Sequence, residues 1–183
     1  MHKAKAMIAC ADQCQADLIE LQSEARCIRD DLEPHLSDLR QRLLAIQDKI
    51  VPGNPKLGNL SDLRHCHYIR TYSLGLAIAI FINEIQLALS IDPWSILSES
   101  NDFATEIVNL AEVACQYRPL GASPLSLCLI AAELGASDIN TKAAAQQLRL
   151  KYDQDFRGPE TGAPAQDLRL VCGRHTLLAQ IFD

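Results

Sequence analysis

The sequence predicts an all-α protein, a single-domain bundle of about six to seven helices with two buried central helices. Three observations support this fold class. The chain has 183 residues, which is enough for one domain with a sizeable core. Aromatic residues make up only 5% of it, and a core built from Leu, Ile and Ala favours helices because strands recruit aromatic and β-branched side chains. Apolar residues also recur at helical spacing along most of the chain.

The first fifty residues carry an amphipathic pattern. Apolar positions are spaced 3, 4, 3 and 4 apart in two successive sets, and Pro34 falls between the sets. Proline either kinks one long helix or begins a second one, so the pattern predicts an amphipathic helical pair over residues 1–50 or one bent helix that covers the core. The alternative is a coiled coil that makes a homodimer through residues 18–50. The two sets are Leu18, Leu21, Ala25, Ile28 and Leu32, then Leu36, Leu39, Leu43, Ile46 and Ile50.

The remaining helices are separated by turn-rich segments. Residues 51–59 are rich in Pro, Gly and Asn, and Ser61 then has the character of an N-cap. The helix that follows is apolar on every side over residues 74–82, which predicts burial all round. Three more helices are expected, and their predicted ranges are Asn101 to Arg118, Pro124 to Gly135, and Ser137 to about Phe156.

These elements define the predicted domain organisation. Residues 1–156 form one helical domain whose core lies within 60–156. Residues 157–166 contain Gly and Pro at a high density and are interpreted as a linker. Residues 167–183 form a predicted C-terminal docking segment, with a short helix over about 176–182.

Composition excludes several function classes. The chain has 17 Lys and Arg against 23 Asp and Glu, a net charge of −6, so no global field attracts it to nucleic acid or anionic lipid. Its longest apolar stretch is much shorter than the roughly 20 residues that span a bilayer. No secretory signal precedes the seven cysteines, which predicts an intracellular, soluble protein with reduced thiols.

The sequence carries no motif that predicts a cofactor or a metal. No phosphate-binding glycine loop, nucleophile elbow or EF-hand loop is present. His65 and His67 flank Cys66, but side chains two residues apart on a helix point about 200° apart. They cannot bind one metal ion together unless another segment supplies further ligands. Cys10 and Cys14 share a face, yet nothing near them completes four ligands. We therefore expect neither a cofactor nor a metal site.

Three segments, residues 68–78, 111–122 and 124–132, resemble the C-terminal part of the regulatory (middle homology) region of fungal zinc-cluster transcription factors. The most specific match is the run from Tyr117 to Ala122, Tyr-Arg-Pro-Leu-Gly-Ala, ahead of an apolar helix. The resemblance covers roughly residues 60–156. It implies an all-helical regulatory module that senses effectors or controls an attached activation function, often within gene clusters for secondary metabolites.

The chain departs from this family in its cysteines. Members read DNA through six closely spaced cysteines that share two metals beside a basic linker. That spacing is absent, so the resemblance implies a regulatory module without direct nucleic acid binding. The seven cysteines are Cys10, Cys14, Cys27, Cys66, Cys115, Cys128 and Cys172.

Polar residues border the most apolar helix and are the candidates for a ligand pocket. Arg70 and Glu84 lie on nearly one face, about 21 Å apart along the axis, and would mark two ends of an apolar cavity. The alternative is that Asn83 and Glu84 lie where the helix emerges into solvent and the tyrosines are ordinary core. Arg118 has a structural alternative, since it ends a helix at a turn. The candidate ligand-binding residues are Tyr68, Arg70, Tyr72, Asn83, Trp94, Tyr117 and Arg118.

Three functions follow from these observations. The first is a stand-alone regulatory or effector-binding helical module that binds a small apolar metabolite or a partner protein, located in the nucleus. The second is a cytoplasmic, cofactor-free enzyme, an isomerase or cyclase of secondary metabolism, with His67, Tyr72 and Glu84 as acid/base residues. The third is a dimerising scaffold that uses the apolar stripe of residues 18–50.

Overall fold

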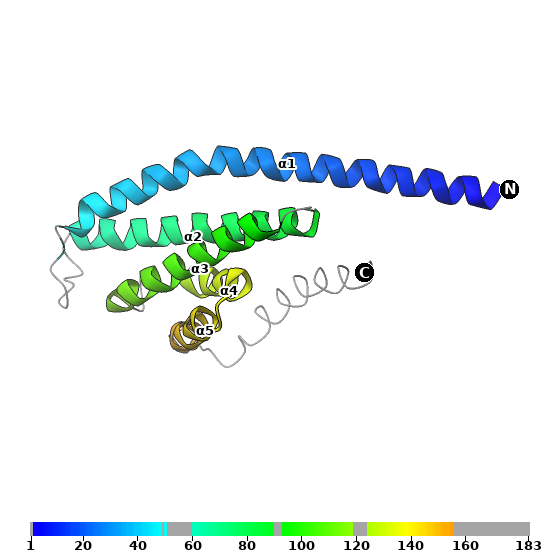
Figure 1. The fold of residues 1–183 in the computed structure, drawn as a ribbon. Coiled ribbons are helices and arrows are strands. Elements are labelled where there is room, and N and C mark those ends of the chain that lie inside the picture. The colour runs from blue at the N-terminus through cyan, green and yellow to red at the C-terminus, as the bar shows by residue number, and fades with distance from the viewer. Residues whose placement is uncertain (1, 49, 51–59, 90–92, 119–123, 156–183) are drawn as a thin grey trace.

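The computed structural model describes residues 2–48, 50, 60–89, 93–118 and 124–155, and for residues 2–16 and 89 the backbone alone. Every regular element in these ranges is a helix, which confirms the all-α fold class. The prediction of six to seven helices also depends on residues 157–183, which lie outside the described residues together with the linker and the docking segment. Figure 1 shows the elements, which are α1 (His2–Gln47), α2 (Leu60–Leu89), α3 (Trp94–Ala114), the short 3-10 helix η1 (Cys115–Tyr117), α4 (Leu125–Gly135) and α5 (Ile139–Gln154).

The first fifty residues form one helix rather than a pair. α1 runs for 46 residues and includes Pro34. Pro34 is exposed, so the carbonyl four residues earlier, which loses its helical donor, lies on a face that water can reach. Such a site bends a helix without ending it, and Figure 1 shows that α1 is bowed. Of the two arrangements that the sequence left open, the single bent helix is present.

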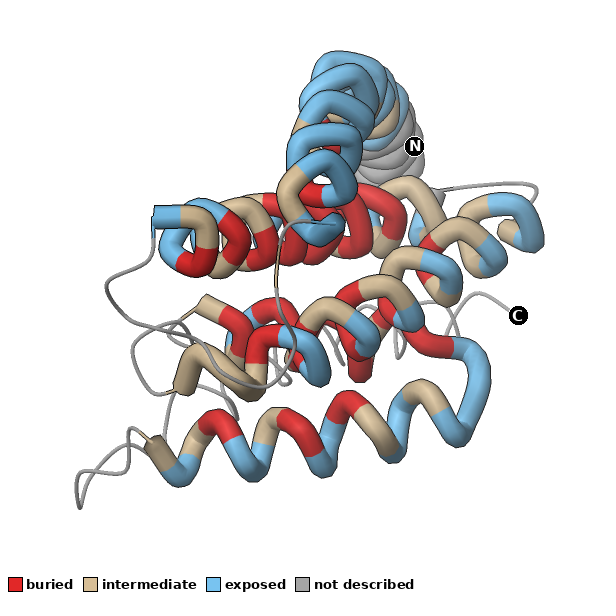
Figure 2. The backbone as a smooth tube through the Cα atoms, turned by 90° about the vertical axis from the view of Figure 1, so that its left-hand side faces the viewer, coloured by how far each residue is buried: buried red, intermediate tan, exposed pale blue. Residues whose placement is uncertain are grey.

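The helices stack in layers, as Figure 2 shows. α1 packs on α2, α2 packs on α3 and α4, and α5 packs on α3 and α4 at the far side. α4 has most of its side chains in this core, because its apolar residues cover nearly the whole circumference. The largest fully buried apolar side chains are Tyr152, Ile69, Leu76, Ile80, Ile107, Leu125 and Leu129.

The predicted apolar stripe of α1 contacts α2 along the second half of α1. Leu36 and Leu43 are buried there. Gly75 of α2 allows a close approach, because a Cβ at this position would lie 2.6 Å from Cδ2 of Leu36. The stripe over residues 36–46 is therefore occupied within one chain and is not free for a coiled coil over the whole of residues 18–50.

α2 is central but is not enclosed on every side. It contacts three other helices, yet Leu74, Ile78 and Ile85 are exposed. The prediction of burial all round fails on this face. In the described part of the chain, α2 is also the one helix that is long and apolar enough to cross a membrane. Half of its apolar window is buried in the bundle, as in the core helix of a soluble protein, so the evidence for a span is weak.

Several helix boundaries differ from the prediction. α3 begins at Trp94, directly after Pro93, rather than near Asn101, because proline is well suited to the start of a helix. α5 is capped by Asp138 rather than by Ser137. The Asp138 carboxylate accepts a hydrogen bond of 2.8 Å from the backbone N–H of Thr141, which satisfies one free donor of the first turn.

Candidate functional site

The three predicted catalytic residues lie at separate levels of α2. Glu84 follows His67 by 17 residues, which corresponds to about 25 Å along a helix. His67 is exposed, Tyr72 is buried and Glu84 is half-buried. The structure therefore does not bring these side chains together around one substrate.

Tyr72 instead joins α2 to its two neighbours. Its hydroxyl interacts with the Glu106 carboxylate of α3, and burial together with this negative charge raises the pKa of Tyr72 well above its ordinary value. Glu106 also forms an ion pair of 3.3 Å with Arg40 of α1. Tyr68, one turn earlier on α2, interacts with Arg42 of α1. Both tyrosines thus hold α1 in place.

Asn83 belongs to a buried polar network that joins α1, α2 and α3. Its amide donates a hydrogen bond of 2.8 Å to Oε2 of Glu99 and one of 3.2 Å to Oγ of Ser100. Glu99 also forms an ion pair with Arg29 of α1, and the Arg29 guanidinium lies 5.4 Å from the ring centroid of Phe103. Asn83 is therefore engaged in helix–helix contacts rather than emerging into solvent.

The predicted ligand-binding residue Trp94 and the predicted catalytic residue Glu84 lie nearer the surface. Trp94, at the start of α3, is 77% exposed. Glu84 faces Lys142 of α5, and burial raises the pKa of its carboxyl while the Lys142 charge lowers it. Asn83 shares a level of α2 with Glu84 but points toward α3. These residues do not line one wall of a common cavity.

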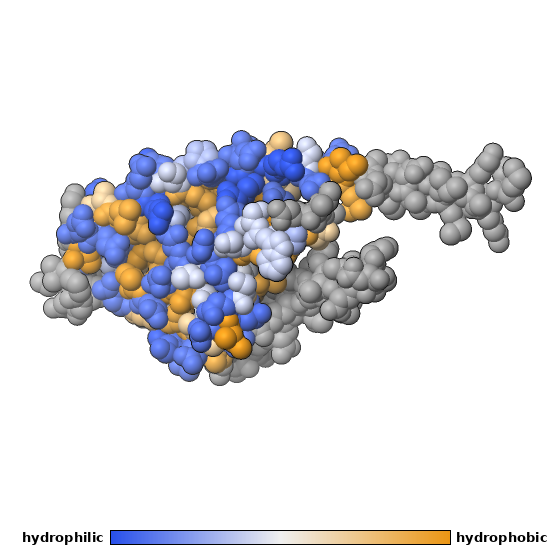
Figure 3. Space-filling view, viewed as in Figure 1, coloured by the Kyte–Doolittle hydropathy of each residue, from blue (hydrophilic) through white to orange (hydrophobic). Residues whose placement is uncertain are grey.

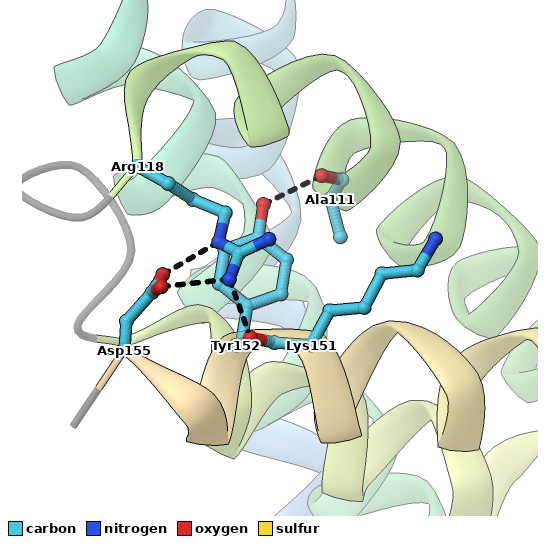
Figure 4. Close-up of polar contacts among 5 residues, drawn as sticks. All are labelled: Ala111, Arg118, Lys151, Tyr152 and Asp155. Atoms are coloured by element: carbon cyan, nitrogen blue, oxygen red, sulfur yellow. Dashed lines mark hydrogen bonds and ion pairs between the residues drawn. The ribbon is translucent and has the colours of Figure 1, made fainter. Parts of the chain in front are cut away.

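Arg118 fastens the end of η1 to the end of α5 (Figure 4). Its Nε and Nη2 donate hydrogen bonds of 2.5 and 2.7 Å to the two carboxylate oxygens of Asp155, and Nη2 also donates one of 2.6 Å to the carbonyl of Lys151. The guanidinium lies over the ring of Tyr152 at 5.5 Å. A bidentate pair of this kind fixes both position and orientation, which supports the structural interpretation of Arg118.

Tyr117 pairs with a histidine at the start of α2. Its hydroxyl shares a hydrogen bond of 2.6 Å with Nδ1 of His65, which is almost fully buried. Burial lowers the pKa of His65, against the opposing charge of Asp62. Burial raises the pKa of Tyr117 to about 12, with smaller contributions from Asp62 and Cys66. The result is a neutral His–Tyr pair beside a carboxylate.

The half-buried Arg70 lies near Cys66, which follows His65 in the chain. Arg70 has a buried Nε without a hydrogen-bond partner, and its charge partly offsets the burial that raises the pKa of the Cys66 thiol. His65 and His67 have opposite environments, buried and exposed, as their spacing predicts. No group of three or more His, Cys, Asp or Glu that could hold a metal is present among the residues that the structure describes.

Exposed apolar side chains gather on a second candidate site, formed by α1 and α2. The two helices are antiparallel, since Leu36 contacts Gly75 and Arg42 contacts Tyr68. Toward the start of α1 and the end of α2, large apolar residues remain exposed on both helices. We call these residues the α1–α2 seam; they are Leu21 and Ile28 of α1 and Leu74, Ile78 and Ile85 of α2, and they are 37% to 54% exposed.

Helical geometry places all five seam residues on the side away from α3. Asn83 marks the α3 side of α2, and rotations of about 140° and 200° separate it from Ile78 and Ile85. Arg29 marks the α3 side of α1. Leu21 and Ile28 lie about 80–100° from Arg29, beyond the buried Ala25. The two exposed edges therefore adjoin each other.

α1 also extends beyond the bundle. With Leu36 beside Gly75, the last residue of α2 lies beside Gln22, so residues 2–21 of α1 extend past α2 by about 30 Å. Leu18 and Leu21, near the base of this overhang, are 42% and 45% exposed. Figure 3 shows an apolar patch where α1 leaves the bundle. An isolated helix of this length is marginal in water unless its apolar face is covered, so the overhang is suited to a partner.

The partners that define these sites are far apart in the sequence, so local spacing did not predict them. His65 and Tyr117 are 52 residues apart, and Asn83 and Glu99 are 16 apart on different helices. One signal was available: Asp62, His65 and Cys66 are spaced 3 and 1 apart, which places them on one face of a helix. Comparison with known protein families, characterised proteins and solved structures finds no match to this chain.

Proposed function

We propose that this chain is a regulatory helical module that acts by binding a partner protein. The observation that carries the proposal is the α1–α2 seam together with the overhang of α1, where large apolar residues are exposed side by side. Contiguous apolar surface of this kind marks protein interaction sites in soluble proteins. The resemblance of residues 60–156 to the regulatory region of fungal zinc-cluster transcription factors supplies the regulatory role and a nuclear location.

The positions of the predicted ligand-binding residues support a protein partner over a small apolar metabolite. Asn83 is engaged with Glu99, Arg118 with Asp155, and Tyr72 with Glu106. A pocket for a small molecule needs several polar groups that converge on one apolar cavity, and these groups are directed at other helices instead.

The same positions weigh against the enzymatic alternative. His67, Tyr72 and Glu84 are spread over about 25 Å of α2, whereas a general acid or base must lie within hydrogen-bond reach of the proton that it transfers. The buried His65–Tyr117 pair is closer to such a geometry. Its histidine is nearly inaccessible, so we assign the pair a structural role.

A transcriptional fusion tests the proposed function. The chain is placed between a heterologous DNA-binding domain and an activation domain, and reporter output is compared with that of a fusion carrying an unrelated helical domain of similar size. A regulatory module is expected to change the output, and Ile28→Glu combined with Ile78→Glu in the seam is expected to abolish the change. Reporter output equal to that of the unrelated domain would contradict the proposal.

A matched variant controls for a general effect of added charge. Leu44 is 56% exposed on α1 but lies outside the seam, so Leu44→Glu should leave the regulatory effect intact. Equal loss in Leu44→Glu and in the seam variant would show that the effect does not depend on this surface.

A further inference from the structure

The overhang of α1 is long enough to cover the α1–α2 seam of a second molecule. The contact of Leu36 with Gly75 fixes the antiparallel register, so that residues 22–37 of α1 run beside residues 74–89 of α2. The seam occupies this stretch of about 24 Å. The overhang, residues 2–21, is a helix longer than this stretch. Its residues 2–17 can therefore run along the whole seam of a second molecule.

The charges of α1 favour one direction for such a pairing. The first five residues carry Lys3 and Lys5 and no acidic residue. Residues 17–33 are strongly acidic, and of their two arginines Arg29 is already paired with Glu99. An antiparallel pair brings the basic start of one helix to Asp31 and Glu33 of the other and leaves only Asp17 and Glu20 near their counterparts, whereas a parallel pair in register brings all of the acidic residues together. The acidic residues are Asp17, Glu20, Glu24, Asp30, Asp31 and Glu33.

We propose that the partner which occupies the α1–α2 seam is a second copy of this chain, with the two α1 helices antiparallel. Pairing centred between Leu18 and Leu21 places residues 2–17 of each copy beside residues 22–37 of the other. Each overhang then covers the seam of the opposite copy, and Lys3 and Lys5 lie within about one turn of the partner copy's acidic stretch. The interface is isologous and closes as a dimer.

This arrangement extends a contact that already exists within the chain. Leu36 and Leu43 of the α1 stripe pack on α2, and Leu18, Leu21 and Ile28 continue the same stripe without a cover. A second α1 supplies the missing apolar neighbour. The inference rests on the proposed function in one respect, namely that the seam binds protein; it adds the identity of that protein.

Light scattering of the purified chain tests the inference. We expect the mass to reach twice 20.2 kDa as the protein concentration is raised to about 200 μM. Ile28→Glu with Ile78→Glu places charges in the apolar seam and should weaken association by about 100-fold or more, with unchanged helix content. Leu44→Glu, outside the seam, should remain dimeric. A wild-type chain that is monomeric over this range, or a dimer that the seam variant leaves intact, would overturn the inference.

Charge reversal tests the direction. Asp31→Lys with Glu33→Lys should weaken an antiparallel dimer by about 10-fold, because the new lysines lie within about one turn of Lys3 and Lys5 of the other copy. Adding Lys3→Glu and Lys5→Glu to that variant should restore it. A stronger dimer after the first change would show parallel helices and overturn the proposed geometry.

The reporter experiment separates this inference from the proposed function. A monomeric chain that still regulates the reporter through the seam would retain the function and remove the second copy as the partner.

Discussion

Replacement of Tyr152 by Phe removes one buried hydrogen bond and little else. The Tyr152 hydroxyl donates a hydrogen bond of 2.6 Å to the carbonyl of Ala111, and the side chain is fully buried. That carbonyl also accepts the backbone N–H of Cys115, so the variant leaves no orphaned acceptor. The ring stays in place beneath Arg118. The perturbation is therefore confined to the hydroxyl.

The expected cost follows from these contacts. A typical intramolecular hydrogen bond contributes about 0.5–1.5 kcal/mol to the free energy of unfolding, so Tyr152→Phe should lose about 1 kcal/mol. For a chain of this size, that corresponds to a fall in Tm of about 2–4 °C. Tyr152→Ala also removes the ring and should cost about 3–5 kcal/mol.

Urea unfolding followed by circular dichroism at 222 nm measures both variants. The midpoint should fall while the slope of free energy against urea stays constant, since the surface exposed on unfolding does not change. Tyr152→Phe with the stability of the wild type would refute the assignment of the hydrogen bond to Ala111. A loss as large as that of Tyr152→Ala would refute the claim that the effect is confined to the hydroxyl.

Three further predictions concern other parts of the bundle. Burial lowers the pKa of His65, so the unfolded state takes up a proton at higher pH than the folded state. The free energy of unfolding should therefore be highest above about pH 7.5 and fall as the pH drops below about 6.5. His65→Gln should flatten this dependence in thermal melts recorded at several pH values. Arg149→Met removes the ion pairs of Arg149 with the buried Glu133 and with Asp153 and should lower the free energy of unfolding by about 3–5 kcal/mol in urea, most of it recovered by adding Glu133→Leu. Pro34→Ala restores a helical hydrogen bond in α1 and should stabilise the chain by up to about 3 kcal/mol, whereas lower stability would show that the bend is required.

Helical periodicity is a local property, and it predicted the elements well. The spacing of the α1 stripe and the apolar run of α2 depend on neighbours within a few residues, and both helices are present. The residues at which helices begin and end were harder to predict, because they depend on which of several neighbouring residues starts the helix. Pro93 allows α3 to start at Trp94, seven residues before the predicted start at Asn101, because the apolar Ile96 and Leu97 continue the helical pattern from there.

The site could not be predicted to the same extent, because its contacts join distant parts of the chain. Polar residues next to the apolar part of α2 suggested a ligand pocket, but their partners lie on other helices, as the pairs of Asn83 with Glu99 and of Arg118 with Asp155 show. Whether a half-apolar side chain faces a cavity or another helix depends on tertiary packing, which a single sequence does not encode locally. The exposed face of α2 was missed for the same reason.

Because α1 is continuous through Pro34, a displacement of its N-terminal end is transmitted along the helix to the bundle. A hinge between two helices would absorb a displacement at the N-terminal end, whereas one bowed helix transmits it. Arg29 and Arg40 attach this helix to Glu99 and Glu106 at two points on α3, about 16 Å apart along α1. A displacement of the overhang therefore acts first on the ion pair of Arg29 with Glu99, which is the attachment nearer to the overhang. The buried amide of Asn83, which is hydrogen-bonded to the same Glu99, is affected next. Anything that grips the first sixteen residues thus acts directly on the polar centre of the bundle.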